Sequence, residues 1–183
     1  MTGKKSMRRT TLANLTLRRR PGNPRQGWLV AGGGAIPVAI GRRGIAANKH
    51  EGDGTTPAGR YRLVRLWFRP DRMPRLRTLL PARAITAADG WCEDPGDRRY
   101  NRPIRIRPGE PGDPLVRGDA LYDLVIELDH NQRPRIAGRG SAVFIHVARA
   151  DMTPTAGCVT MPAAPLRRLL ARLGPATTLT ILS

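Results

Sequence analysis

Thr155-Ala156-Gly157-Cys158-Val159-Thr160-Met161-Pro162 is the most informative stretch of this 183-residue chain. It follows the apolar run Ala142-Val143-Phe144-Ile145-His146-Val147, so Cys158 comes only a short distance after His146. The thiolate is the nucleophilic form of cysteine, and a neutral imidazole is suited to remove the thiol proton near neutral pH. Gly157 permits close approach to the backbone, and the N–H groups of Gly157 and Cys158 are candidates to bind an oxyanion. The stretch therefore predicts a cysteine acyl-transfer site, with a buried structural thiol and a satisfied core histidine as the alternative interpretations.

Composition limits the other classes of function. The two cysteines, Cys92 and Cys158, are too few for a disulfide scaffold, and the sequence has no CxxC or HExxH motif, so we expect no metal and no cofactor. A disulfide between them would consume the nucleophile, and we expect both thiols to be free. The formal net charge of +18 would concentrate anionic polymers near the surface. No helix or aromatic-rich strand organises the arginines, so no specific nucleic-acid partner is expected.

Alternation and turn residues predict a mainly β protein. The expected strands are 13–20, a hairpin of 28–31 and 35–40 around Gly32-Gly33-Gly34, 60–68 buried on both faces, 122–128, 142–147, 158–161 and 177–182. One helix is expected after Pro162 or Pro165, with Leu166, Leu169, Leu170 and Leu173 on one face and Gly174-Pro175 at its end.

Two segments lack these patterns. Residues 41–59 are predicted to be a loop, and residues 69–121 a long excursion with little regular structure. Trp91 and Cys92 in the excursion would form either a lid over the site or a small satellite core.

Several separated blocks, in the right order, resemble the YkuD-type L,D-transpeptidase catalytic domain, in its ErfK/YbiS/YcfS/YnhG-related branch. The blocks are Glu51-Gly52-Asp53-Gly54-Thr55-Thr56-Pro57-Ala58-Gly59 followed by a strand, Gly90-Trp91-Cys92-Glu93-Asp94-Pro95, Tyr100-Asn101-Arg102-Pro103, Leu121-Tyr122-Asp123-Leu124-Val125, and His146 with the Gly157-Cys158 turn. The resemblance covers roughly Leu15 to the C-terminus. It implies a mixed β-sandwich with one packed C-terminal helix, over residues 13–183 after a basic tail of residues 1–12.

The resemblance also implies a reaction on peptidoglycan stem peptides. Cys158 would attack the bond between meso-diaminopimelate and the terminal D-alanine, with His146 as base and later acid, and with the Gly157 and Cys158 N–H groups as oxyanion donors. A second stem's amine would then resolve the thioester, while water as acceptor would give carboxypeptidase activity.

The chain departs from the family signature Ser-His-Gly-Cys, because Thr155-Ala156 replace Ser-His. Thr160 stands where the family has a polar contact residue, and Thr155, Ala156 and Thr160 are the expected substrate-binding positions. Either Asp151 or a backbone carbonyl, of Thr155 or a neighbour, would orient His146, and we favour the backbone.

The function expected from these features is an L,D-transpeptidase. The alternatives are an L,D-carboxypeptidase or amidase on the same peptides, and a non-catalytic basic module that binds anionic polymers. We expect a monomer without a membrane span. The substrate places it in the cell envelope or periplasm, whereas the lack of an apolar signal segment in residues 1–20 leaves the cytoplasm as the alternative.

Overall fold

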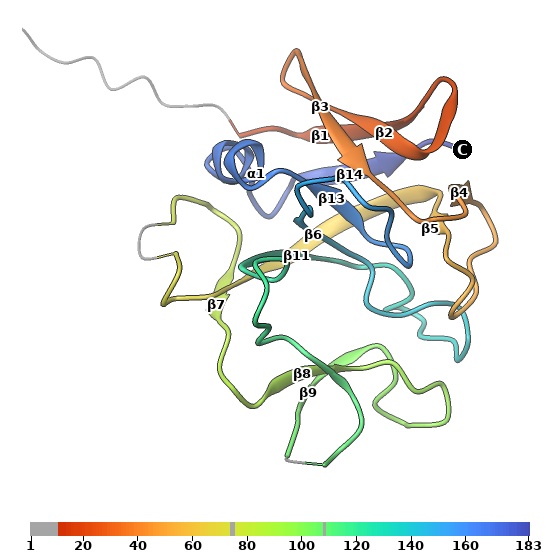
Figure 1. Ribbon diagram of the computed structural model, residues 1–183, viewed down its shortest axis with the longest axis vertical. Helices are drawn as coiled ribbons and strands as arrows, with labels where there is room; N and C mark the ends of the chain where they lie inside the picture. The colour runs from red at the N-terminus through yellow and green to blue at the C-terminus, as the bar shows by residue number, and fades with distance from the viewer. Residues whose placement is uncertain (1–10, 74–75, 108) are drawn as a thin grey trace, which may run out of the picture.

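The computed structural model describes residues 11–73, 76–107 and 109–183 (Figure 1). The basic tail expected at residues 1–12 therefore lies almost entirely outside the described residues. Within them, nine strands form the main sheet: β1 (Asn14–Arg20), β2 (Asn23–Ala31), β3 (Gly34–Ala39), β6 (Gly59–Phe68), β7 (Ala82–Ala84), β11 (Leu124–Leu128), β12 (Phe144–Val147), β13 (Val159–Met161) and β14 (Thr178–Ile181).

The main sheet is mixed and closes on itself. Its strand order is β11-β12-β13-β3-β2-β1-β14-β6-β7, and β11 also pairs with β6. The β1–β14, β12–β13 and β6–β7 pairs are parallel, and the other pairs are antiparallel. The prediction of a mixed, mainly β fold is confirmed. The strands belong to one continuous sheet, because β11 pairs with both β12 and β6.

The expected hairpin and closing strand are present. β2 and β3 pair antiparallel up to Ala31 opposite Gly34, which leaves Gly32 and Gly33 as the two-residue turn, both with positive φ. β1 has Leu15 and Leu17 fully buried, and the parallel strand β14 places Leu179 and Ile181 beside them. The period-2 pattern of each strand therefore directs its apolar residues into one core. Strand β6 is buried on both faces only in its second half, because Gly59 to Arg62 are largely exposed.

The single helix expected near the C-terminus is α1 (Ala163–Leu170). Its Leu166, Leu169 and Leu170 are buried in the main core, and Leu173 is buried just after the helix ends. In the described part of the chain no helix has the length and apolar character needed to cross a membrane.

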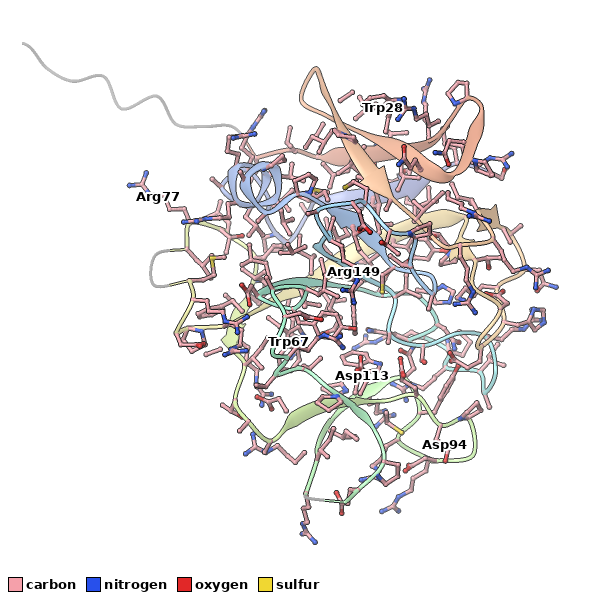
Figure 2. The ribbon with its side chains drawn as sticks, viewed as in Figure 1. Trp28, Trp67, Arg77, Asp94, Asp113 and Arg149 are labelled. Carbon is pink, nitrogen blue, oxygen red and sulfur yellow. The ribbon has the colours of Figure 1, made fainter. Side chains whose placement is uncertain are left out.

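The excursion of residues 69–121 contains more regular structure than expected. It supplies β7 to the main sheet and forms a small antiparallel sheet of β10 (Asp113–Pro114), β8 (Asp89–Cys92) and β9 (Arg102–Arg105). Figure 1 shows β8 and β9 at the opposite end of the molecule from β1–β3, and Figure 2 labels Asp94 at that end and Trp28 at the other. The expectation of little regular structure was therefore wrong for this part.

Trp91 of β8 packs in a second core, not over the site as a lid. It is 1% exposed, and its ring meets Phe144 of β12 edge-on at 5.0 Å. The Trp91 indole N–H donates to Asn101. Of the two interpretations of Trp91, the satellite core is the correct one, and this core joins the small sheet to the strand that carries His146.

The loop expected at residues 41–59 contains only two short strands, β4 (Ile45–Ala46) and β5 (Thr56–Pro57), which pair in parallel. The rest of this segment lies against the turn before Cys158, as described below.

Candidate active site

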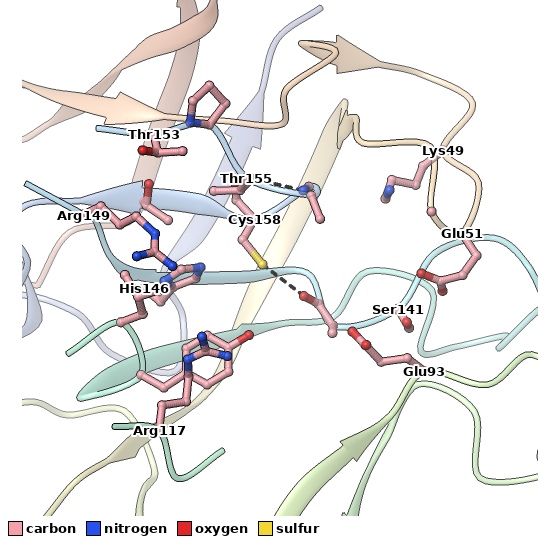
Figure 3. A pocket seen from close by; sticks show the side chains of 18 residues that line it. Lys49, Glu51, Glu93, Arg117, Ser141, His146, Arg149, Thr153, Thr155 and Cys158 are labelled. Atoms are coloured by element: carbon pink, nitrogen blue, oxygen red, sulfur yellow. Dashed lines mark hydrogen bonds between the residues drawn. The ribbon is translucent and has the colours of Figure 1, made fainter. Parts of the chain in front are cut away.

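A cavity of about 530 Å³ opens beside Cys158 (Figure 3). Its walls come from the 49–52 segment, the excursion, the end of β12 and the turn that precedes β13. The lining includes the expected catalytic residues His146, Gly157 and Cys158, together with the expected binding residues Thr155, Ala156 and Thr160. The topology therefore brings all six residues singled out in the sequence to one cavity.

The parallel pairing of β12 and β13 sets the positions of the two reactive side chains. Ile145 pairs with Val159 and His146 with Thr160. Cys158, which immediately precedes β13, therefore lies beside Phe144. Both strands end at the same edge because they are parallel. This register explains why a histidine and a cysteine twelve residues apart face the same cavity.

The imidazole of His146 is held by the backbone. Its Nδ1 lies 2.9 Å from the Val147 carbonyl oxygen, which can only accept, so Nδ1 carries the proton and Nε2 has a free lone pair. Burial lowers the pKa of His146 to about 4. Hydrogen bonds to the Val147 and Leu121 carbonyls raise the pKa, but this effect is smaller than that of burial. The ring is therefore neutral near pH 7 and has the protonation state of a base.

The backbone orients His146, as expected, but the carbonyl belongs to Val147 and not to Thr155. Asp151 instead accepts hydrogen bonds from the amide and hydroxyl of Thr153. The ring of Tyr122 packs edge-on against the imidazole, with the two centroids 5.2 Å apart.

The thiol of Cys158 is partly exposed to the cavity and free of any disulfide. Its Sγ–H donates to the Ala142 carbonyl oxygen at 3.1 Å. Burial raises the pKa of the thiol to about 12, although a backbone hydrogen bond with Phe144 favours the thiolate. The resting pair is therefore a neutral thiol and a neutral imidazole, not a thiolate–imidazolium ion pair.

The turn before Cys158 is fastened by the Thr155 hydroxyl. Thr155 Oγ1 accepts from the Gly157 N–H at 3.0 Å and donates to the Cys158 carbonyl at 2.6 Å. The Gly157 N–H is thus engaged within the turn, whereas the Cys158 N–H makes no hydrogen bond within the described part of the chain. Of the two expected oxyanion donors, the Cys158 N–H is the one available without rearrangement.

The other two expected binding positions differ in character. Ala156 is exposed at the cavity wall, while Thr160 is 2% exposed and its hydroxyl lies 3.5 Å from the Ala39 carbonyl. Thr160 therefore has a backbone partner in addition to its place in the lining.

The glycine-rich segment that follows Glu51 supports this turn from behind. Asp53 accepts hydrogen bonds from the amides of His50 and Thr55, the Thr55 hydroxyl and Lys49 Nζ, the last at 2.6 Å. Burial alone would raise the pKa of Asp53, but these bonds lower it well below its usual value. A Cβ on Gly157 would lie 2.8 Å from the Thr55 carbonyl oxygen, so only glycine fits against this segment.

The cavity also contains charged residues to which the sequence assigned no role. Figure 3 shows Arg117 and Arg149 on the His146 side of the sulfur, and Lys49, Glu51, Glu93 and Ser141 on the other side. Glu51, Glu93 and Leu121-Tyr122 lie within the blocks that resemble the family, and this was the only sign in the sequence that they belong to the site. Their convergence on one cavity depends on the tertiary fold.

A family model for the YkuD L,D-transpeptidase catalytic domain matches residues 18–181, nearly the whole chain. The chain belongs to this family. Like other YkuD domains, it is a catalytic domain of the L,D-transpeptidase type, from a family that acts on peptidoglycan peptides. No curated protein and no solved structure gives a significant match.

Proposed function

We propose that this YkuD domain is an L,D-transpeptidase that forms an acyl-enzyme on Cys158 at the meso-diaminopimelate–D-alanine bond. The observation that carries the proposal is the position of Cys158 and His146 on one cavity wall, in a chain of this family. The neutral imidazole with its free Nε2 supports the role of His146 as base.

The reaction starts when the thiol leaves the Ala142 carbonyl and transfers its proton to His146 Nε2. The thiolate attacks the peptide carbonyl carbon, and the Cys158 N–H stabilises the oxyanion that forms. The C–N bond then breaks, and the imidazolium gives its proton to the departing D-alanine amine. A thioester between Cys158 and the stem peptide remains.

The second half repeats these steps in reverse order. An amine of another stem peptide loses a proton to His146 and attacks the thioester carbonyl. The C–S bond breaks, and the thiolate recovers its proton from the imidazolium. Water in place of the amine yields the trimmed peptide, which is the carboxypeptidase outcome.

The neutral resting pair fits a nucleophile that is activated only with substrate in place. A bound peptide removes water from the cavity and brings the oxyanion donor and the leaving group into position. A permanently charged thiolate would instead react with any small electrophile that entered the cavity.

The substrate class leads us to propose that the enzyme acts at the cell envelope. Fractionation of cells that carry a C-terminally tagged chromosomal copy tests this. Protein confined to the cytoplasm, with unchanged wall crosslinks in a deletion strain, would contradict it.

Incubation with a disaccharide-tetrapeptide, followed by mass analysis of the products, tests the reaction. A crosslinked dimer with release of D-alanine is the expected result. A trimmed tripeptide alone would identify a carboxypeptidase, and an unchanged substrate would support a non-catalytic binding module.

A further inference from the structure

The cavity beside Cys158 has opposite charges at its two ends. Arg117 and Arg149 share one carboxylate at the end near His146. Arg117 makes a bidentate contact with Asp119 at 2.9 and 3.0 Å, and Arg149 lies 4.0 Å from it. The guanidinium of Arg117 also stacks over the Tyr122 ring that packs against the imidazole. Arg117 also lies 4.0 Å from Asp113, so it is balanced by two carboxylates, whereas Arg149 meets only the Asp119 carboxylate that Arg117 already holds and is the less neutralised cation of this end.

The far end, beyond the sulfur, is acidic. Glu51 accepts a hydrogen bond from the Tyr100 hydroxyl, but the Glu93 carboxylate makes none to any described residue. Desolvation by the cavity wall and the like charges of Asp113 and Glu51 raise the pKa of Glu93 to about 7, although Glu93 is an exposed residue at the mouth of the cavity. Neither Glu93 nor Glu51 forms an ion pair within the described part of the chain, whereas Asp113 lies 4.0 Å from Arg117.

Lys49 does not supply an ion-pair partner to either of these two carboxylates. Its side chain is 5% exposed, and its ammonium is paired with Asp53 at 2.6 Å and donates to the His50 carbonyl. Its charge is therefore already balanced behind the catalytic turn.

Ser141 adds an independent sign of a ligand. It is 7% exposed and lines the cavity, yet its Oγ makes no hydrogen bond of normal geometry to any described residue and has only a looser contact with the Tyr100 hydroxyl. The nearby Tyr100 hydroxyl donates to Glu51 instead. A buried hydroxyl without a partner is costly, so an external group is the natural partner for its lone pairs.

The chemistry at Cys158 decides what lies at each end. His146 must protonate the departing amine, so the leaving amino acid and its free carboxylate lie on the side of Arg117 and Arg149. The incoming amine takes the same place, because the second half of the reaction reverses the first. The acidic end consequently faces the part of the donor that stays bound to the enzyme.

We propose that Glu93, Glu51 and Ser141 form a subsite for a primary ammonium on the side chain of the acyl-donor residue. This inference rests on the proposed function. Glu93 is the carboxyl group of the subsite without an ion-pair partner and becomes fully ionised when the ammonium binds, Glu51 is the second carboxylate, and Ser141 accepts a further N–H of the ammonium, which has three donors. Together with the positive end, the subsite orients the donor across the sulfur.

The test uses two tetrapeptide donors that differ only in the side-chain amine of the diamino acid, which is free in one and N-acetylated in the other. Acylation is measured as single-turnover release of D-alanine with enzyme in excess, so that no acceptor is needed. The wild-type enzyme is expected to acylate with the free-amine donor roughly ten-fold faster or more, the usual range for one charged hydrogen bond.

Glu93→Gln is expected to remove most of that preference, because it slows acylation by the free-amine donor. Glu110→Gln is the matched control, because Glu110 is an exposed acid of the same excursion outside the cavity lining, and it should keep the wild-type preference. Ser141→Ala should reduce the preference in part.

Equal rates with both donors in the wild-type enzyme would overturn the subsite, as would an undiminished preference in Glu93→Gln. Absence of D-alanine release from either donor would instead defeat the proposed function, and the subsite with it.

Discussion

The Thr56 hydroxyl donates a 2.9 Å hydrogen bond to the Gly157 carbonyl and so joins the glycine-rich segment to the residue before Cys158. Thr56 is fully buried, and its Oγ1 also accepts from the Gly41 N–H at 2.8 Å. The Thr155 amide and carbonyl add bonds to Ile40 and Arg42. The catalytic turn is therefore held by a network from the first third of the chain.

Thr56→Val keeps the shape of the side chain but removes both bonds. We expect a loss of about 1–3 kcal/mol in the free energy of unfolding, because the Gly157 carbonyl and Gly41 amide lose their buried partner. Thr56→Ser should restore most of it. Chemical denaturation of the three proteins measures the effect, and a Thr56→Val protein as stable as wild type would contradict the role of this contact.

Gly157→Ala places a Cβ at 2.8 Å from the Thr55 carbonyl oxygen. The backbone on one side must then shift, so we expect lower stability and loss of most activity. The control is Gly118→Ala, because a Cβ there meets nothing within 4 Å. Thermal unfolding and turnover should separate the two variants clearly. Similar behaviour of both would show that the turn is not tightly packed.

Asp53→Asn should weaken the support behind the turn in a pH-dependent way. The pKa of Asp53 is lowered in the folded state by its hydrogen bonds, so its charge stabilises the fold above the pKa of the unfolded chain, near 4. The difference in unfolding free energy between wild type and Asp53→Asn should be full at neutral pH. It should shrink as the pH falls below about 4 toward the folded pKa. A difference that grows on acidification would have the wrong sign.

His146→Ala should lower turnover by about 10²–10⁴-fold, the usual range for loss of a general base. Because the pKa of His146 is lowered to about 4, wild-type turnover should not fall through protonation of the imidazole between pH 6 and 8.

Because the pKa of the Cys158 thiol is raised, iodoacetamide should label the free enzyme slowly at pH 7 and faster as the pH rises. Fast labelling at pH 7 that is lost in His146→Ala would indicate a preformed ion pair instead.

Much of the main sheet could be predicted from local pattern. Alternation in β1 and β14 and the Gly32-Gly33 turn are short-range features, and each is present. The small sheet of the excursion could not be predicted in this way. It depends on Asp89, buried between Arg83 and Arg105, and on Trp91 packing against Phe144. The contacts of Asp89 with Arg105 and of Trp91 with Phe144 join residues that are far apart in the sequence.

The candidate site, too, could be predicted from the sequence only in part. His146 lies on β12 and Cys158 immediately precedes the neighbouring strand β13, only twelve residues later, so their shared cavity could be predicted from the sequence. The engagement of the Gly157 amide by Thr155 and the acidic end at Glu51 and Glu93 depend on side-chain placement. No local pattern contains that information.

Intact-mass analysis after mixing with a tetrapeptide donor tests the central claim most directly. The account predicts an adduct equal to the donor minus D-alanine, located on Cys158 and absent from Cys158→Ala. It also predicts that Cys92→Ala, which removes the buried thiol of β8, still forms the adduct. Crosslinked or trimmed product from Cys158→Ala, or an adduct on any other residue, would contradict the assignment of Cys158 as the nucleophile.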